Sequence, residues 1–338
     1  MKKVALTCTL LLISCTKIDV QKNNYDFVIA FGSCNNQNLR NPFWHEIIRT
    51  KPNVWIWGGD NIYADTSNLS QMKKEYAIQW QQPNYKEFAE SIPILGIWDD
   101  HDYGLNDGGY NFSIKRESQQ VFLDFLQVPS NDDRRNKDGI YHSQSYSTQK
   151  GIIKVILLDT RFFRTELTVD PDTNPLKIYK PNNYGKGTIL GKKQWQWLET
   201  ELNESNADFN IIVSSIQFLS SEHGWEKWNN FPHELDRLKK LLKESIAKRI
   251  ILLSGDRHMS EFSRVKTKNN NFLVDFTSSG LTHTTTDFDN EYNPNRIGEV
   301  INVKNFGLLK FNFDPMTVTF QMVGEKNRLL QEHIENYN

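Results

Sequence analysis

Short, nearly continuous apolar segments recur along this chain, and segments with helical spacing separate them. The apolar segments are residues 27–31, 54–58, 94–98, 152–158, 209–214 and 249–254. Runs of this length are typical of strands that are buried on both faces of a sheet. The helical spacing lies in residues 71–82, 117–126, 192–202 and 234–247. Because strands that alternate with helices favour parallel pairing, this order predicts an α/β fold.

The composition is that of one globular domain. The chain has 338 residues, of which 38% are hydrophobic and 24% charged, so it can bury a core and is not disordered as a whole. After residue 264 strand-like segments follow one another at 272–277, 306–313 and 318–323, which predicts an antiparallel end. Neither a repeat nor a long linker divides residues 26–338, so we expect a single domain there.

The charge balance argues against nucleic acid as a partner. Lys and Arg number 40 and Asp and Glu number 41, giving a net charge of −1. A nucleic-acid binder needs a basic excess for its phosphate contacts. We therefore expect no nucleic-acid binding, whereas the oligomeric state is left open by the sequence.

The first residues resemble a bacterial export signal. Lys2 and Lys3 precede an apolar stretch at residues 4–13 that is too short to span a bilayer. The sequence Leu12-Ile13-Ser14-Cys15 resembles a lipobox, whose Cys becomes the lipidated first residue of the mature protein. We expect residues 1–14 to be a lipoprotein signal peptide and residues 15–25 a polar tether, with Cys15 anchoring an exported protein that faces the periplasm or the cell surface. An ordinary signal peptide is the alternative.

Chemically active side chains follow each of the six apolar segments. Ligands of open α/β sheets bind at the carboxyl ends of strands. The side chains found there are Cys34, Asp60, Tyr63, Asp99, Asp100, His101, Asp102, Asn106, Arg161, Gln217, Asp256 and His258. One aspartate at a strand end is more often a helix cap than a ligand. Five carboxylates in one crevice, however, would repel one another strongly without bound cations.

The donor types indicate which cations these are. The carboxylates of Asp60, Asp100 and Asp256 suit Ca²⁺, Mg²⁺ or Mn²⁺, whereas thiolate, phenolate and imidazole together suit iron or zinc. A two-metal centre bridged by Asp60 accommodates both sets and can activate a hydroxide for phosphoryl displacement. Arg161 would bind phosphate through its planar guanidinium, and His101 would protonate the leaving oxygen.

Two of these donors also have simpler interpretations. A single free cysteine is often only a small buried hydrophobic residue, and a tyrosine beside a groove often only packs. Cys34 directly follows a predicted strand and Gly-Ser, in a chain that we expect to be exported, which favours a metal-protected thiolate. His283 is a further candidate, because it follows the turn-like Ser278-Ser279-Gly280.

In order and spacing, these motifs resemble those of the PhoD-like alkaline phosphatases in the metallophosphoesterase (calcineurin-like) superfamily. The motifs are Gly32-Ser33-Cys34, Gly59-Asp60-Asn61-Ile62-Tyr63, Trp98-Asp99-Asp100-His101-Asp102-Tyr103-Gly104, Leu158-Asp159-Thr160-Arg161, Ser215-Ile216-Gln217 and Ser254-Gly255-Asp256-Arg257-His258. The likeness extends over residues 27–335. It implies a four-layer α/β/β/α sandwich with a single catalytic domain.

The resemblance also implies a ligand set. Cys34, Asp60 and Tyr63 would bind Fe(III) together with His258, and Ca(II) would share Asp60 and be bound by Asp100 and Asp256. Zinc or manganese are the alternative metals. Asn106 and Gln217 would complete the second metal site or contact the substrate. In relatives a C-terminal helix is thought to gate the site, and whether residues 329–337 do so here is left open by the sequence.

The implied function is that of an exported metal-dependent phosphatase that hydrolyses phosphate monoesters or diesters. One alternative is a phosphodiesterase or phospholipase-type enzyme that acts on lipid or polymer phosphodiesters. A second alternative is a surface lipoprotein that binds phosphate or glycan without catalysis, although such a binder would not need so complete a set of metal ligands. A serine hydrolase is disfavoured, because the sequence contains no Gly-x-Ser-x-Gly motif.

Overall fold

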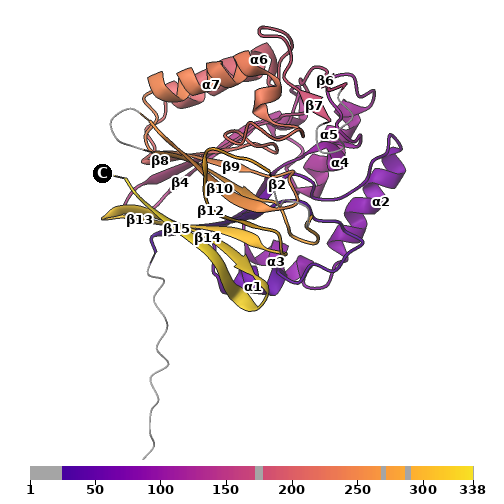
Figure 1. The fold of residues 1–338 in the computed structure, drawn as a ribbon. Coiled ribbons are helices and arrows are strands. Elements are labelled where there is room, and N and C mark those ends of the chain that lie inside the picture. The colour runs from indigo at the N-terminus through magenta and orange to yellow at the C-terminus, as the bar shows by residue number, and fades with distance from the viewer. Residues whose placement is uncertain (1–24, 172–177, 268–271, 286–290, 338) are drawn as a thin grey trace, which may run out of the picture.

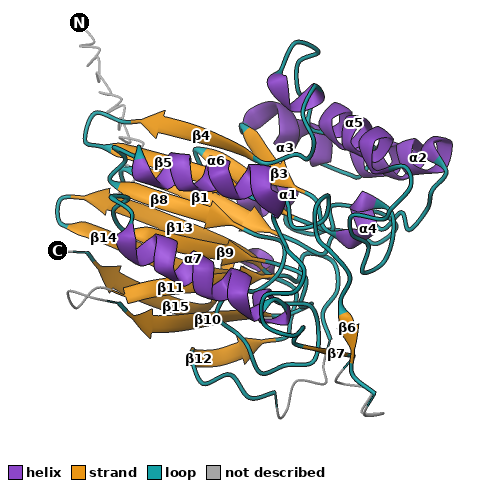
Figure 2. Ribbon diagram, turned by 90° about the horizontal axis from the view of Figure 1, so that it is seen from above, coloured by secondary structure: helices purple, strands orange, loops and turns teal. Residues whose placement is uncertain are grey.

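The computed structural model describes residues 25–171, 178–267, 272–285 and 291–337. Two large mixed sheets pack face to face, and helices cover their outer faces (Figures 1 and 2). This arrangement is the predicted four-layer α/β/β/α sandwich. Residues 1–24, with the predicted signal peptide, Cys15 and most of the tether, lie outside the described part. Within the described part, no helix is long and apolar enough to cross a membrane.

The first sheet has the strand order β15-β14-β13-β1-β2-β3. Its strands are β1 (Phe27–Gly32), β2 (Val54–Gly58), β3 (Ile94–Ile97), β13 (Phe306–Phe313), β14 (Met316–Gly324) and β15 (Arg328–Asn336). Strand β2 pairs in parallel with both β1 and β3, whereas β13, β14 and β15 add antiparallel strands on the other side of β1. Two segments of the predicted antiparallel end, residues 306–313 and 318–323, therefore belong to this sheet, whereas residues 272–277 lie in the second sheet and pair in parallel on one side.

The second sheet has the order β12-β10-β11-β9-β8-β5-β4. Its strands are β4 (His142–Ser147), β5 (Ile152–Leu157), β8 (Phe209–Val213), β9 (Ile250–Ser254), β10 (Ser260–Lys266), β11 (Phe272–Ser278) and β12 (Arg296–Ile301). The four strands β5, β8, β9 and β11 run parallel. A separate pair is formed by β6 (Thr168–Val169) and β7 (Tyr179–Lys180).

All six predicted apolar segments are strands, and their ends agree with the prediction to within a residue or two. The helices are α1 (Trp44–Arg49), α2 (Leu69–Trp80), α3 (Tyr85–Ser91), α4 (Asp100–Tyr103), α5 (Lys115–Phe125), α6 (Gly191–Asn203) and α7 (Pro232–Glu244), with short 3-10 turns η1 (Asp133–Arg135), η2 (Trp228–Asn230) and η4 (Glu325–Asn327). Helices α1, α3 and α4 have no counterpart in the prediction, because they are too short to show helical periodicity.

Hydrophobic packing holds the layers together. Phe31 of β1 meets Phe276 of β11 edge to face across the two sheets, with ring centroids 4.8 Å apart. Trp44 of α1 packs on Trp55 and Trp57 of β2, on the outer face of the first sheet. Leu235 and Leu238 attach α7 to the second sheet. Residues 245–247 of the predicted helical segment lie beyond the end of α7, and Ile246 there is 64% exposed.

The C-terminal segment is a strand, not a helix like the one thought to gate the site in relatives. Residues Arg328–Asn336 form β15, which pairs antiparallel with β14 along the edge of the first sheet. The side chain of Glu335 in this strand forms a salt bridge with Arg264 of the second sheet. The segment is therefore part of the sandwich.

Candidate metal centre

The loops that follow the parallel strands of both sheets meet at one edge of the sandwich. Cys34 follows β1, Asp60 follows β2 and His258 follows β9. One ligand atom of each of these three residues lies within 4.8 Å of the others. Cys34 Sγ is 3.3 Å from Asp60 Oδ2, and the Tyr63 hydroxyl is 2.9 Å from His258 Nε2. The residues predicted to bind the first metal therefore form one cluster.

A second cluster shares Asp60 with the first. The carboxylates of Asp60, Asp99, Asp100 and Asp256 each offer an oxygen within 4.8 Å of the others. Asp60 is thus the one side chain common to the thiol–imidazole group and the carboxylate group. This is the position that a bridging ligand occupies between two cations.

The chemistry of this donor set fits two bound cations. Within the described residues, Asp60 Oδ1 and Asp99 Oδ2 are buried atoms that accept no hydrogen bond. Burial, followed by the nearby Cys34 thiol, raises the pKa of Asp60 well above its usual range. Burial likewise raises the pKa of Cys34 to about 12. Cations held between these groups would oppose both effects and stabilise the ionised ligands.

The backbone at four of the predicted ligands adopts the left-handed conformation. Cys34, Asp60, Asp256 and His258 have φ values of 58°, 51°, 68° and 52°. Each such residue costs roughly 1–3 kcal/mol, and strain of this kind clusters at functional sites. Gly59, with φ 101°, must be glycine, because a Cβ atom there would lie 2.7 Å from Asp99 Cβ. The strained turns allow neighbouring loops to approach one another and aim their side chains at a common point.

His101 is held by a carboxylate that the sequence reading overlooked. Its Nδ1 lies 2.7 Å from Asp65 Oδ2, and its ring packs on Tyr63 with centroids 4.2 Å apart. Burial alone would lower the pKa of His101, but the carboxylates of Asp60, Asp65 and Asp100 outweigh it and raise that pKa to about 10. His101 also offers a ring nitrogen within 4.8 Å of ligand atoms of Asp60 and Asp100, so it lies beside the carboxylate cluster.

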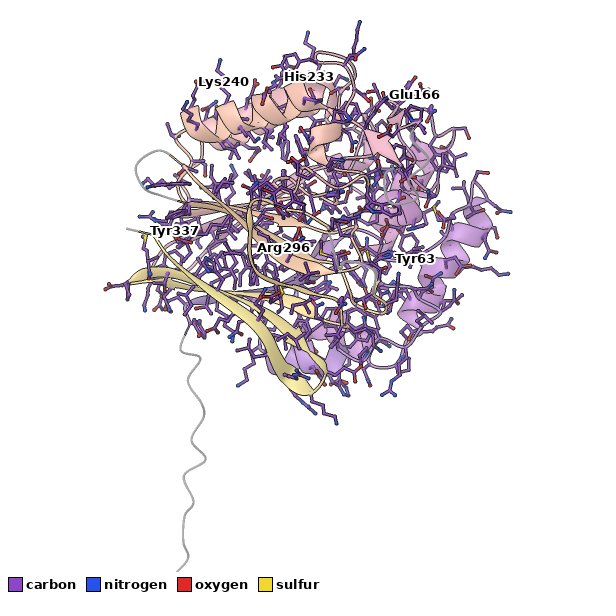
Figure 3. All side chains as sticks on the ribbon, in the orientation of Figure 1. Tyr63, Glu166, His233, Lys240, Arg296 and Tyr337 are labelled. Atoms are coloured by element: carbon purple, nitrogen blue, oxygen red, sulfur yellow. The ribbon has the colours of Figure 1, made fainter. Side chains whose placement is uncertain are left out.

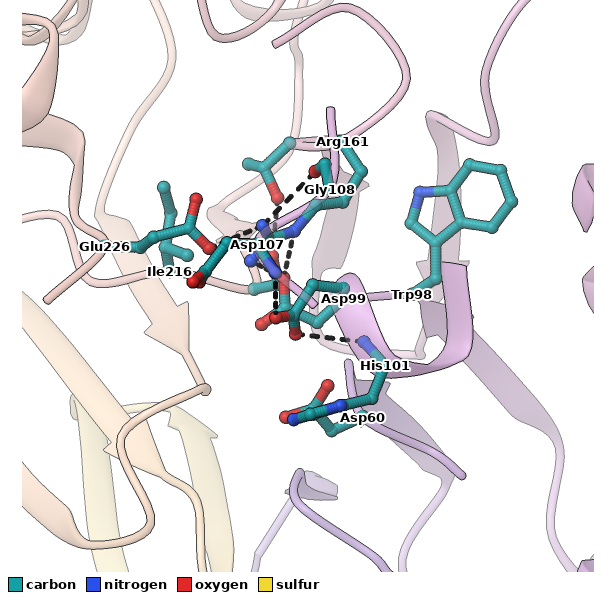
Figure 4. A network of polar contacts seen from close by, with 12 residues as sticks. Asp60, Trp98, Asp99, His101, Asp107, Gly108, Arg161, Ile216 and Glu226 are labelled. Carbon is teal, nitrogen blue, oxygen red and sulfur yellow. Dashed lines mark hydrogen bonds and ion pairs between the residues drawn. The ribbon is translucent and has the colours of Figure 1, made fainter. Parts of the chain in front are cut away.

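Arg161 is fully buried between two carboxylates (Figure 4). Its Nε donates to Asp99 Oδ1 at 2.5 Å, and its Nη1 donates to Glu226 Oε2 at 2.5 Å. Glu226 also pairs with Arg164 at 3.3 Å. The guanidinium therefore balances part of the negative charge around Asp99, and phosphate binding by Arg161 stays a prediction. Glu226 could not be found from the strand-end pattern, because it lies in the long loop between β8 and α7.

Asn106 and Gln217 occupy different surroundings. Asn106 is exposed, and its amide donates to Asp107 Oδ2 at 3.0 Å, while the Asp107 backbone amide donates to Asp100 Oδ2 at 2.7 Å. Gln217 is buried, and its Nε2 donates to Glu261 and Thr277, each at 2.8 Å. Its amide nitrogen is thus engaged with β10 and β11. Ligand or substrate roles for these two residues stay predictions.

Two further residues join the centre. His283 Nε2 lies 3.1 Å from the Tyr63 hydroxyl, as the turn before it suggested. Ser279 Oγ lies 2.9 Å from Cys34 Sγ. It also accepts a hydrogen bond from the backbone amide of His258 at 2.9 Å. Ser279 belongs to the turn after β11, so it ties the ligands from the two sheets together.

Comparisons with known proteins agree with this geometry. Residues 28–322 match the family model described as PhoD-like phosphatase. Alkaline phosphatase D of Bacillus subtilis (strain 168) is 23% identical over 266 residues, which make up 68% of this chain and 44% of the relative. The chain therefore spans less than half the length of this curated relative.

Solved structures share the fold. A structure of PhoD superposes with a TM-score of 0.73 at 17% identity, covering 93% of this chain and 69% of the other. A dimetal phosphatase from Danio rerio gives a TM-score of 0.58 at 13% identity, covering 93% and 100% respectively. The family model covers most of the described sandwich and its ligand-bearing loops, and it confirms the resemblance seen in the motifs. This chain belongs to the PhoD-like phosphatase family.

Proposed function

We propose that this protein is a metal-dependent phosphoric ester hydrolase that cleaves phosphate monoesters or diesters at a two-metal centre. The observation that carries the proposal is the position of Asp60, which belongs to both clusters of ligand atoms. The names of its relatives, an alkaline phosphatase D and a dimetal phosphatase, point to the same reaction class.

The side chains divide into roles by their position. Cys34, Asp60, Tyr63 and His258 would hold one cation, and Asp60, Asp100 and Asp256 the other, with Asp99 beside them. Bound cations supply Lewis-acid activation and neutralise the charge that develops in phosphoryl transfer. His101, oriented by Asp65, would protonate the leaving oxygen. Arg161 would add positive charge beside Asp99.

A paired substrate assay tests this function. The full chain, purified without chelators, is expected to hydrolyse 4-nitrophenyl phosphate or bis(4-nitrophenyl) phosphate. Dialysis against a chelator should abolish turnover, and metal addition should restore it. The ratio of the two rates separates a monoesterase from a phosphodiesterase. A metal-loaded, folded protein that cleaves neither substrate would instead favour a lipoprotein that binds phosphate or glycan without catalysis.

We further propose Fe(III) and Ca(II) as the metals, because one cluster has a thiol, a phenol and an imidazole whereas the other has only carboxylates. A thiolate and a phenolate bound to ferric iron should colour the protein. Cys34→Ser is expected to shift or bleach this absorption, whereas the metal content of the carboxylate group should change less. Visible spectra and elemental analysis of both proteins provide the measurement. A colourless wild type that contains only zinc or manganese would contradict iron and leave the hydrolase proposal standing.

The location of the protein is also a proposal. The basic residues Lys2 and Lys3, the apolar stretch after them and the lipobox-like sequence ending at Cys15 support an exported lipoprotein. The anchored protein would face the periplasm or the cell surface, and its substrate would be a phosphate ester in that compartment.

A further inference from the structure

A cavity lies between α7 and the outer face of the second sheet. It has a volume of about 680 Å³, which is within the usual range of ligand pockets, roughly 300–1,000 Å³. Its lining contains none of the proposed metal ligands and neither His101 nor Arg161. We call it the α7 cavity. In Figure 3 the labels His233 and Lys240 mark α7, and the label Tyr337 marks a lining residue near the C-terminus of the chain.

Apolar side chains line much of the α7 cavity, and we call this part its floor. Leu235 and Leu242 contribute from α7, Phe218 from the loop after β8, Ile250 from β9 and Leu273 from β11. Leu235, Phe218 and Leu273 are buried in the hydrophobic cluster that joins α7 to the sheet. Contact with this floor removes apolar surface from water and so makes binding more favourable. A ligand that uses it must itself be largely apolar.

The charged residues that line the α7 cavity, within the described chain, are all basic. Lys239 and Lys243, one turn apart on α7, line the cavity together with Arg249 and Lys266, and among the described residues no aspartate or glutamate lines it. In the whole chain acidic and basic residues are nearly equal in number, 41 against 40. None of the three lysines forms a salt bridge with a carboxylate of the described residues, and all three are exposed. Four cations around an apolar floor, with no salt-bridge partner in the described part of the chain, attract an anion.

We propose that the α7 cavity binds a single-chain anionic amphiphile, with its alkyl chain on the apolar floor and its carboxylate or phosphate head at Lys239 and Lys243. Free phosphate would not use the floor, and a neutral lipid would not use the lysines. The chain's own residues 1–24 include Lys2, Lys3, Lys17 and Lys22, so the same lysines would repel that segment. The proposal is independent of the phosphatase activity, because the cavity shares no residue with the metal centre.

Calorimetric titration with dodecanoate below its micellar concentration tests this site, because a carboxylate amphiphile is not a phosphatase substrate. The full chain should bind dodecanoate saturably with one-to-one stoichiometry. The double variant Lys239→Glu/Lys243→Glu should bind roughly tenfold more weakly, since two attractions become repulsions. The matched control is Lys192→Glu/Lys193→Glu, which makes the same charge change at exposed positions of the neighbouring helix α6 and should keep full affinity.

Val265→Trp, which fills the cavity from β10 without changing its charge, should also weaken dodecanoate binding. Dodecyltrimethylammonium, with the same chain and a cationic head, should not bind. Equal affinity in both lysine double variants, or no saturable binding by the wild type, would overturn the proposal. Binding to anionic phospholipid vesicles through Lys239 and Lys243 without binding of monomeric dodecanoate would also overturn it and would identify a membrane-docking face instead. Turnover of 4-nitrophenyl phosphate should be the same in all lysine variants, so a failure here does not touch the phosphatase proposal.

Discussion

Asp60→Asn is expected to lower phosphatase turnover by about 10³-fold or more and to remove most of both metals. Asp60 is the side chain shared by the two clusters of ligand atoms, and asparagine keeps its shape while removing its charge. The backbone should tolerate the change, because asparagine adopts the left-handed conformation that Asp60 has at φ 51°. Elemental analysis and steady-state kinetics of the purified variant provide the measurement.

The metal-free proteins give an independent check on the same assignment. Without cations, the buried Asp60 carboxylate is repelled by Asp99 and Asp100, and burial already disfavours its ionised form. Metal-free Asp60→Asn should therefore unfold at the same temperature as the metal-free wild type, or at a higher one. Asp236→Asn, an exposed site on α7, is the matched control and should leave metal content and turnover unchanged. Normal metal content and normal turnover in Asp60→Asn would refute the bridging role.

His101→Ala is expected to slow the hydrolysis of an alkyl phosphate by roughly 10²–10⁴-fold, which is the usual contribution of a general acid. The loss should be small for 4-nitrophenyl phosphate, because nitrophenolate leaves without a proton. Asp65→Asn should cause a smaller loss with the same substrate dependence, since Asp65 orients the imidazole through the 2.7 Å contact with Nδ1. Comparing kcat for the two substrates in both variants separates leaving-group protonation from a general loss of structure.

A second histidine–carboxylate pair provides the control. His45 and Glu87 lie 2.9 Å apart on helices α1 and α3, and neither belongs to the clusters of ligand atoms. His45→Ala should leave both substrates unaffected. Equal slowing of both substrates in His101→Ala would show that His101 orients a metal or binds phosphate rather than protonating the leaving group.

Much of the fold could be predicted because its strands are buried on both faces. A strand such as β2, with two neighbours in its sheet and α1 packed on it, must be apolar at nearly every position, so Val54–Gly58 stands out as a continuous run. The same rule located Cys34 and Asp60, because the polar residue after a buried parallel strand emerges at the ligand-binding edge. By contrast, β15 is a largely exposed edge strand without a continuous apolar run, and its place in the sheet follows from its pairing with β14.

The sequence by itself determined the order of the buried strands and most of the side chains at their carboxyl ends, because both depend on local hydrophobicity and on which residue follows which strand. Only the tertiary structure decided that Glu226 pairs with Arg161, that Asp65 orients His101, and that Ser279 links Cys34 to His258. It also decided where Lys239 and Lys243 meet Arg249 and Lys266 around one cavity. These groups lie in loops and on surfaces, where no periodic pattern is imposed by burial, and their partners are chosen by distances in space that the packing of two sheets creates.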